Sequence, residues 1–387
     1  MYFMGGALSV FFGSIMTELL AHYHASYASG GFLILLQSVG FIAGVPLTAW
    51  SMKRFHYRFI LSGCALAVAL AQFTILTLPG LRWVYLLVIL NGLGGAGLET
   101  AVASYVMELF EGRRAIFMSR LEVAFGSGAL GMPIVASGLI ALHAWRFSSL
   151  LLGLFALILA LTWQSISISL SPTATEGHMD ARTAAPPVFR GRAGKYSVLM
   201  LFLLMIFVYV GVEGSLNSFL PTIFVVHLSL RPAVASLSSS TFWIAMVFGR
   251  MAIGWIVRHV TYENYILASL TLGIVLFLVL AGLKSPWASY VIVFGLGLAL
   301  SAVYSITMVY ANHTFPGMER TVTSAVTAFA GMGGATFPAL IGYAMDHLAP
   351  TGVLWLVFSF AAVLLILFLV IYGSLWFIRR RRVEVAA

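Results

Sequence analysis

Long apolar runs, separated by short polar breaks, fill almost the whole chain. Each run is about 20 residues or longer, which is enough for a helix to cross the ~30 Å hydrocarbon core of a bilayer. Because the runs are continuous and do not alternate with polar residues, they are typical of membrane helices and not of barrel strands. The pattern predicts an all-α membrane protein with twelve transmembrane helices, at residues 2–22, 30–52, 58–79, 83–109, 116–142, 147–167, 197–222, 233–257, 264–283, 287–311, 320–345 and 351–378.

Composition excludes a soluble fold and offers no sign of an enzyme. Of the 387 residues, 61% are hydrophobic and 9% are charged, and the mean hydropathy is +1.01. A soluble domain of this length cannot bury that much apolar surface. The sequence has no P-loop, HExxH or GxSxG motif and no metal-ligand cluster, so neither an enzymatic activity nor a cofactor is expected. The single Cys64 leaves no intrachain disulfide.

Basic residues gather at every second break, and this alternation predicts the topology. Of the 21 Lys and Arg residues, 17 fall on one set of breaks and in the tail, and 4 fall on the other set. By the positive-inside rule the richer side is cytoplasmic, which places both termini there. The net charge of +9 therefore indicates a multi-pass protein of the cell inner membrane, in contact with lipid and not with nucleic acid. The first span has no cleavage signature and is expected to be retained.

A polar stretch at 168–196 divides the chain, and the two halves resemble each other. Its composition predicts a cytoplasmic linker between a six-helix bundle at 1–167 and a second bundle, with a basic tail, at 197–387. Similar residues recur at three near-equal offsets. Asn91–Ala96 resembles Phe294–Ala299, 203 positions later. Gly126, Gly128 and Pro133 recur after 205 positions as Gly331, Gly333 and Pro338, and Arg54 recurs after 204 positions as Arg258. Two parallel repeats are typical of a transporter that rocks around a midplane site. We expect a monomer.

Four acidic residues lie inside the predicted spans, and these are Glu18, Glu99, Glu122 and Glu213. An ionised carboxylate in hydrocarbon is costly, so such a residue faces a cavity, pairs with a cation or stays protonated. Glu99 is the main candidate for a proton carrier. Gly92, Gly95 and Ala103 share its helix face and leave room beside it. The alternative is a protonated Glu99 that bonds to a neighbouring helix.

Glu18 and Glu122 each have a charged or titratable neighbour. Glu18 shares a helix face with His22, and a Glu–His pair is a second candidate for proton coupling. The alternative is that His22 is an interfacial polar residue, since a metal site is not expected there. Glu122 follows Arg120 near the inner end of its span, and the two residues are predicted to form a gate or structural ion pair.

Other polar and aromatic residues inside the spans are candidates for substrate contact. Tyr209, Glu213 and Asn217 are spaced i, i+4 and i+8, which predicts a stripe that binds hydroxyl groups or, alternatively, an interhelical hydrogen-bonded seam. Candidate substrate-binding residues, besides this stripe and Glu99, are Gln37, Asn91, Trp243 and Tyr304. The aromatic rings would stack on a sugar ring, unless they serve only for packing.

Four segments resemble one branch of a known transporter family. They are GLGGAGLETAV (92–102), MSRLEVAFGSGAL (118–130), FVYVGVEGSLNSFLP (207–221) and FGRMAIGW (248–255). The whole chain resembles the major facilitator superfamily, and these segments are similar to the fucose/glucose/mannose:proton symporter branch, in particular to bacterial glucose/mannose:proton symporters. In fucose-permease relatives, the span-4 Glu and a span-1 acid bind proton and sugar, and the resemblance assigns these roles to Glu99 and Glu18.

The predicted function is proton-coupled symport of a small hydrophilic solute, a hexose-type sugar, by alternating access. The alternative is a facilitator-superfamily exporter that expels drugs or amphiphilic metabolites in exchange for protons. Exporters carry a Gly-Pro pattern in span 5, and Gly126–Pro133 is partly similar, with Met132 in place of the glycine before Pro133.

Overall fold

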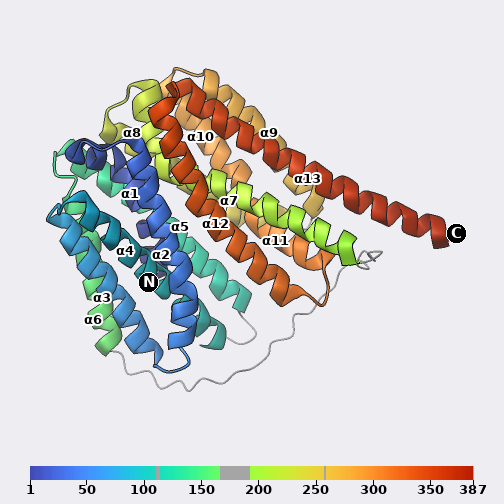
Figure 1. The fold of residues 1–387 in the computed structure, drawn as a ribbon, viewed down its shortest axis with the longest axis horizontal. Coiled ribbons are helices and arrows are strands. Elements are labelled where there is room, and N and C mark those ends of the chain that lie inside the picture. The colour runs from blue at the N-terminus through green and yellow to red at the C-terminus, as the bar shows by residue number, and fades with distance from the viewer. Residues whose placement is uncertain (110–113, 166–191, 257–258, 387) are drawn as a thin grey trace.

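The computed structural model describes residues 1–109, 114–165, 192–256 and 259–386. Within them the chain is helical (Figure 1). The helices are α1 (Tyr2–Tyr23), α2 (Tyr27–Ser51), α3 (Tyr57–Leu76), α4 (Leu81–Leu109), α5 (Arg114–Ala141), α6 (Phe147–Ser165), α7 (Arg192–Leu228), α8 (Pro232–Ile256), α9 (Tyr262–Gly282), α10 (Pro286–Leu300), α11 (Val303–Thr314), α12 (Glu319–His347) and α13 (Pro350–Ala386).

In the described part of the chain, twelve helical segments are long and apolar enough to cross a membrane, so the predicted number of spans is confirmed. Helices α10 and α11 together make one of these spans, Pro286–Thr314. Most of the predicted linker, residues 168–191, lies outside the described residues, and residues 192–196 begin α7.

The span made by α10 and α11 is broken, which the apolar pattern did not predict. Helix α10 ends at Leu300, and α11 starts at Val303 after Ala302, whose φ is −127° and ψ is 10°. The break frees two carbonyls from helical hydrogen bonding. The Tyr209 hydroxyl donates to the Leu300 carbonyl (2.7 Å), and Arg250 Nε donates to the Ser301 carbonyl (3.2 Å). Side chains from α7 and α8 therefore satisfy backbone groups that lipid could not.

The helices form two groups. Helices α1–α6, here the N-terminal bundle, pack mainly on one another, and so do α7–α13, the C-terminal bundle. Contacts between the bundles are made chiefly by α2 with α12, α5 with α8 and α1 with α7. In Figure 1, α3 and α6 lie at one edge of the molecule and α9 and α13 at the other, with α2 and α12 between them. We name the side where α6 ends and α7 begins the linker face, and the other side the opposite face.

Equivalent positions of the two halves make equivalent contacts. A Cβ at Gly126 would meet Val247, and a Cβ at Gly331 would meet Ile42. Gly331 follows Gly126 by 205 residues, and Val247 follows Ile42 by the same number. The second contact is therefore the counterpart of the first, with the glycine now in the C-terminal bundle and its partner in the N-terminal bundle. The glycines allow the interface helices to approach closely at both places. The interface thus has approximate twofold symmetry, the arrangement expected for alternating access around a shared axis.

At the opposite face the two bundles are in close contact through α2 and α12. The Asp346 carboxylate at the end of α12 accepts hydrogen bonds from the first backbone N–H groups of α2, those of Tyr27 (2.9 Å) and Ala28 (2.7 Å). A methyl group at Gly342 would lie 2.5 Å from the Tyr27 carbonyl, so the α2 and α12 backbones nearly touch there. On the other side of the interface, Ser240 donates to the Leu130 carbonyl (2.8 Å).

Candidate functional site

Arg250 of α8 lies at the centre of a cluster of charges between the bundles. Its Nη1 is 3.3 Å from Glu122 Oε2 in the N-terminal bundle, and its Nη2 is 3.6 Å from Glu213 Oε1 in the C-terminal bundle. The guanidinium also lies over the Trp243 ring, 5.6 Å from its centroid, and its Nε contacts the helix break at Ser301. A planar guanidinium with several donors is suited to hold such partners together.

Arg250 is one of the 17 basic residues that the charge pattern assigned to the cytoplasmic breaks and tail, but it does not lie in a break between spans. Arg250 lies inside the span Pro232–Ile253, and its side chain is 28% exposed. Its two carboxylate partners differ in exposure, with 52% for the Glu122 side chain and 16% for Glu213. The Glu213–Arg250 contact is therefore the more desolvated one, whereas Glu122 is open to solvent from the linker half of the interface.

The predicted ion pair between Arg120 and Glu122 does not form. The Arg120 guanidinium lies over the Phe117 ring, 5.0 Å from its centroid, and Glu122 pairs with Arg250 instead. Residues two apart on a helix point in different directions, which explains why the neighbours in sequence do not meet. A gate or structural role for Glu122 thus involves α8.

Asn217 of α7 is fixed by two partners. Its Nδ2 donates to the Ser9 carbonyl of α1 (3.0 Å), and its Oδ1 accepts from Trp243 Nε1 (2.7 Å). Trp243 is 4% exposed and also packs on Phe125 of α5, with ring centroids 5.7 Å apart. In this conformation Trp243 therefore orients Asn217, and its buried ring has no open face on which a sugar would stack.

The Glu99 carboxyl of α4 lies against α1. A Cβ built on Gly5 would be 2.5 Å from Glu99 Oε1, so the carboxyl occupies the space that the missing side chain leaves. Gly5 and Ser9 are one helical turn apart, so α1 contacts both the Glu99 and the Asn217 side chains.

The three residues of the stripe predicted on α7 lie in two different environments, one buried and one at the bundle interface. Tyr209 is 1% exposed, and its hydroxyl donates to the carbonyl of Leu300 at the helix break. Glu213 and Asn217 are half-buried and face the interface with α8 and α1. Tyr304 of α11 is half-buried too. The structure therefore assembles Glu213 and Asn217 near Arg250: Glu213 is in contact with the guanidinium, and Asn217 is bonded to the Trp243 ring that the guanidinium overlies.

Two amide candidates lie within the N-terminal bundle. Gln37 Nε2 donates to the Leu8 carbonyl (3.1 Å), and the residue is half-buried between α1 and α2. Asn91 is 1% exposed and accepts a long hydrogen bond from the buried Gln72 of α3 (3.4 Å). Asn91 therefore faces α3 in this conformation, whereas Gln37 remains near the α1 backbone that carries Gly5 and Ser9.

Glu18 and His22 are not joined by an ion pair or a hydrogen bond in the described part of the chain. The exposed His22 ring packs edge-on against Tyr23 and lies 6.0 Å from the Trp145 ring. Glu18 is half-buried. Among the described residues, no group of three His, Cys, Asp or Glu side chains could hold a metal ion.

The comparisons with known proteins agree with this architecture. The chain matches the Major Facilitator Superfamily over residues 1–338 and, in an overlapping match, over residues 202–386. It belongs to this superfamily. The protein is therefore a facilitator-superfamily membrane transporter and not an enzyme.

Proteins similar to this facilitator-superfamily chain include a sugar transporter, similar in sequence, and solved transporter structures that are similar in fold. It is 28% identical over 352 residues to the glucose/mannose transporter GlcP of Bacillus subtilis (strain 168), covering 89% of this chain and 86% of that protein. It is similar in fold to the nucleoside transporter NupG (TM-score 0.75, 13% identity, 96% and 97% of the two chains). It is also similar to a bacterial homologue of the human lysosomal transporter Spinster in an inward-facing and occupied conformation (TM-score 0.73, 13% identity, 98% and 94%).

Proposed function

We propose that the protein is a proton-coupled symporter of a hexose-type sugar, with its site at the bundle interface around Arg250. The observation that carries the proposal is the assembly of Glu122, Glu213 and Arg250 at the meeting point of the bundles, beside Asn217. Carboxylates, an amide and a guanidinium are the groups that bind sugar hydroxyls. The sequence relation to a named glucose/mannose transporter supports a hexose as substrate.

Access to this site is proposed to alternate between the two faces. The contacts of Asp346 with the start of α2 join the bundles at the opposite face, while the Glu122 side chain is half-exposed on the linker half. The basic residues of the linker-side breaks favour a cytoplasmic linker face in the inner membrane, with both termini inside. In this conformation sugar would reach the site from the cytoplasm. In the alternate conformation, with the linker face closed, sugar would reach the site from outside.

Glu99 is proposed to carry the proton. Burial disfavours the ionised form of a carboxyl, and Glu99 lies beside α1 with no ion-pair partner among the described residues. Glu213, in contrast, has Arg250 as a neighbour of opposite charge. Glu18 remains the second candidate for coupling, with less support because His22 does not contact it. We assign the sugar hydroxyls to Glu213, Asn217 and Tyr304, with Glu99 and Gln37 on the other side.

Sugar-dependent proton movement tests this function. The purified chain is reconstituted in weakly buffered vesicles, and external pH is followed after addition of glucose, mannose, fucose or a nucleoside. Symport predicts external alkalinisation with a hexose and none with vesicles that lack the protein. Acidification on addition of an amphiphilic drug would favour the exporter, and hexose uptake without any pH change would contradict proton coupling.

A further inference from the structure

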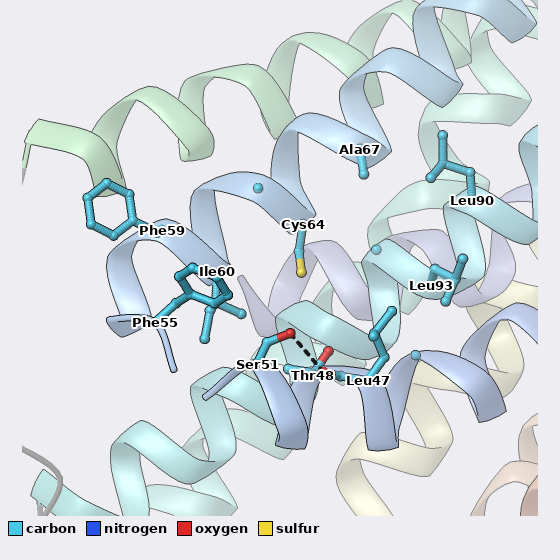
Figure 2. A pocket seen from close by; sticks show the side chains of 13 residues that line it. Leu47, Thr48, Ser51, Phe55, Phe59, Ile60, Cys64, Ala67, Leu90 and Leu93 are labelled. Carbon is cyan, nitrogen blue, oxygen red and sulfur yellow. Dashed lines mark hydrogen bonds between the residues drawn. The ribbon is translucent and has the colours of Figure 1, made fainter. Parts of the chain in front are cut away.

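An apolar groove lies on the outside of the N-terminal bundle, away from the Arg250 cluster. Helices α2 and α3 both pack on α4 but hardly on each other, and the space between them is a cavity of about 420 Å³. Figure 2 shows Phe55 and Phe59 at one end of this groove, Leu90 and Leu93 at the other, and Cys64 between them. Its volume is in the range of ordinary ligand sites.

The groove reaches from the linker face to about the middle of the membrane. Its α3 wall begins near Tyr57, at the linker face, and extends to Ala67, ten residues further on. At 1.5 Å per residue this is ~15 Å, about half of the ~30 Å hydrocarbon core. The depth therefore equals one leaflet, which is the depth to which a single phospholipid extends.

The walls of the groove suit an acyl chain. The hydroxyl of Ser51, one of the few polar groups there, donates to the Leu47 carbonyl of its own helix (2.8 Å, dashed in Figure 2). Leu47 and Phe59 are among the exposed large apolar residues, at 54% and 46%. In a membrane protein such residues meet lipid tails.

The mouth of the groove is strongly basic. Lys53 and Arg54 follow the end of α2, and Arg58 lies in the first turn of α3. The Arg58 guanidinium lies over the Phe59 ring (4.5 Å to its centroid), and Arg54 lies over Trp50 (4.4 Å). Stacking on these rings holds both guanidinium groups at the level where lipid headgroups begin.

Among the described residues, these three cations have no acidic partner to neutralise them. The sequence contains no Asp or Glu between residues 19 and 98, and within the described chain Lys53, Arg54 and Arg58 form no ion pair. A cluster of unneutralised basic residues attracts anionic headgroups from the surrounding leaflet.

We propose that this groove binds an anionic phospholipid of the linker-face leaflet. One acyl chain lies between α2 and α3, and the phosphate is held by Lys53, Arg54 and Arg58. The combination of one-leaflet depth, apolar walls and an unpaired basic mouth favours this occupant over a neutral lipid, because a neutral lipid would leave the three cations unneutralised.

The test compares phospholipids that differ only in headgroup charge. The full chain, in detergent, is incubated with equal amounts of phosphatidylglycerol and phosphatidylcholine of identical acyl chains, and retained lipid is measured by native mass spectrometry. We expect selective retention of phosphatidylglycerol that decreases as salt is raised. Replacement of Lys53, Arg54 and Arg58 by Gln should weaken that preference by roughly 100-fold, given the usual gain per basic side chain near an anionic surface.

A second variant tests the groove itself. Nothing lies within 4 Å of a Cβ built on Gly63, a lining residue, so Gly63→Leu fills the groove without a clash while keeping all three cations. It should abolish retention of phosphatidylglycerol. Gly138→Leu, at an equally open position on α5, and Arg146→Gln, whose guanidinium lies over Phe147, are the matched controls and should retain the lipid.

Three results would overturn the proposal. They are equal retention of the two lipids by the wild type, unchanged retention by the triple Gln variant, and competition by glycerol phosphate as strong as by the lipid. The last would indicate a site for a free anion. If the triple variant does not yield folded protein, Arg58→Gln alone provides the same comparison.

Discussion

The Glu99 carboxyl occupies the space beside Gly5, where a methyl group would come 2.5 Å from its Oε1. We predict that Gly5→Ala displaces the carboxyl by rotating its flexible side chain, without separating α1 from α4. Because a misplacement of ~1 Å can lower the rate of a reacting group by up to ~100-fold, proton-driven sugar accumulation should fall by roughly 10- to 100-fold. The melting temperature of the purified protein should change little, by no more than about 3 °C.

Gly6→Ala provides the contrast to Gly5→Ala. A Cβ at Gly6 would overlap the backbone carbonyl of Phe125 in α5, and backbone cannot rotate away as a carboxylate can. This variant should lose about 1–3 kcal/mol of stability, as overpacked cores do. If Gly5→Ala destabilises the protein as much as Gly6→Ala, the Glu99 side chain does not rotate away from the added methyl group.

Asn217→Ala is predicted to weaken substrate binding through Trp243 as well as directly. The substitution leaves the buried Trp243 Nε1 and the Ser9 carbonyl without their partner. A buried polar group left unpaired costs about 1–3 kcal/mol, so the affinity for sugar should fall by roughly 5- to 100-fold or the protein should lose comparable stability. Isothermal titration and thermal unfolding separate the two effects, and Ser215→Ala, whose hydroxyl donates only to its own helix, is the control.

Asp346 is predicted to stabilise the conformation that is closed on the opposite face. Its carboxylate caps the N-terminus of α2 through the Tyr27 and Ala28 N–H groups, and such caps contribute about 1 kcal/mol. Asp346→Ala should therefore increase the population open on that face by roughly fivefold. The measurement is the rate at which an impermeant maleimide alkylates the cysteine of Ser240→Cys, in a background where Cys64 is replaced by Ser. Ser240 is only 6% exposed, so this rate should rise by about the same factor as the open population. An unchanged rate would show that Asp346 does not hold the face closed.

Glu99→Gln is predicted to separate substrate exchange from coupling. Glutamine keeps the shape and hydrogen-bonding capacity of a protonated carboxyl but cannot ionise. Labelled sugar should still exchange across vesicles, while accumulation against a gradient should be lost because the proton-release step no longer occurs. Normal accumulation in this variant would move the proton to Glu18. Normal accumulation in both Glu99→Gln and Glu18→Gln would contradict coupling through these carboxylates.

The spans were predictable from sequence, whereas the central cluster was not. Length and hydropathy of each run are enough to predict a membrane helix, and Glu99 was identifiable because a carboxyl in hydrocarbon is rare. Arg250 is different, because its partners lie 128 residues away at Glu122 and 51 residues away at Ser301. Only folding brings these groups together, so sequence position suggested an ordinary basic residue at the end of a span.

The break at Ser301 and Ala302 was missed for a similar reason. The surrounding residues are apolar and contain no proline, so local preference favours a continuous helix through α10 and α11. Tertiary hydrogen bonds from Tyr209 and Arg250 to the freed carbonyls stabilise the break instead. The sequence contained one indication of Arg250, though not of the break, because Arg250 belongs to the segment FGRMAIGW that resembles the symporter branch.

The two carboxylates around Arg250 are predicted to differ in their contribution to stability. Glu122 is 52% exposed, so its ion pair should contribute no more than about 1 kcal/mol, and Glu122→Gln should fold normally. Arg250→Gln, in contrast, leaves the 16% exposed Glu213 without its cation and the Ser301 carbonyl without its Arg250 donor. Breaking a buried pair in this way costs about 3–5 kcal/mol.

The combined variant Arg250→Gln/Glu213→Gln tests whether the loss is electrostatic. Removing both charges eliminates the unpaired carboxylate, so thermal unfolding should show most of the stability of the wild type restored. Sugar binding should still be lost, because Glu213 is assigned to the substrate and Arg250 lies at the centre of the proposed site. Arg250→Gln/Glu122→Gln is the matched control and should restore nothing, since Glu213 remains unpaired. Equal rescue by both double variants would mean that Arg250 stabilises the fold through its hydrogen bond to Ser301 and its contact with Trp243, and not by neutralising Glu213.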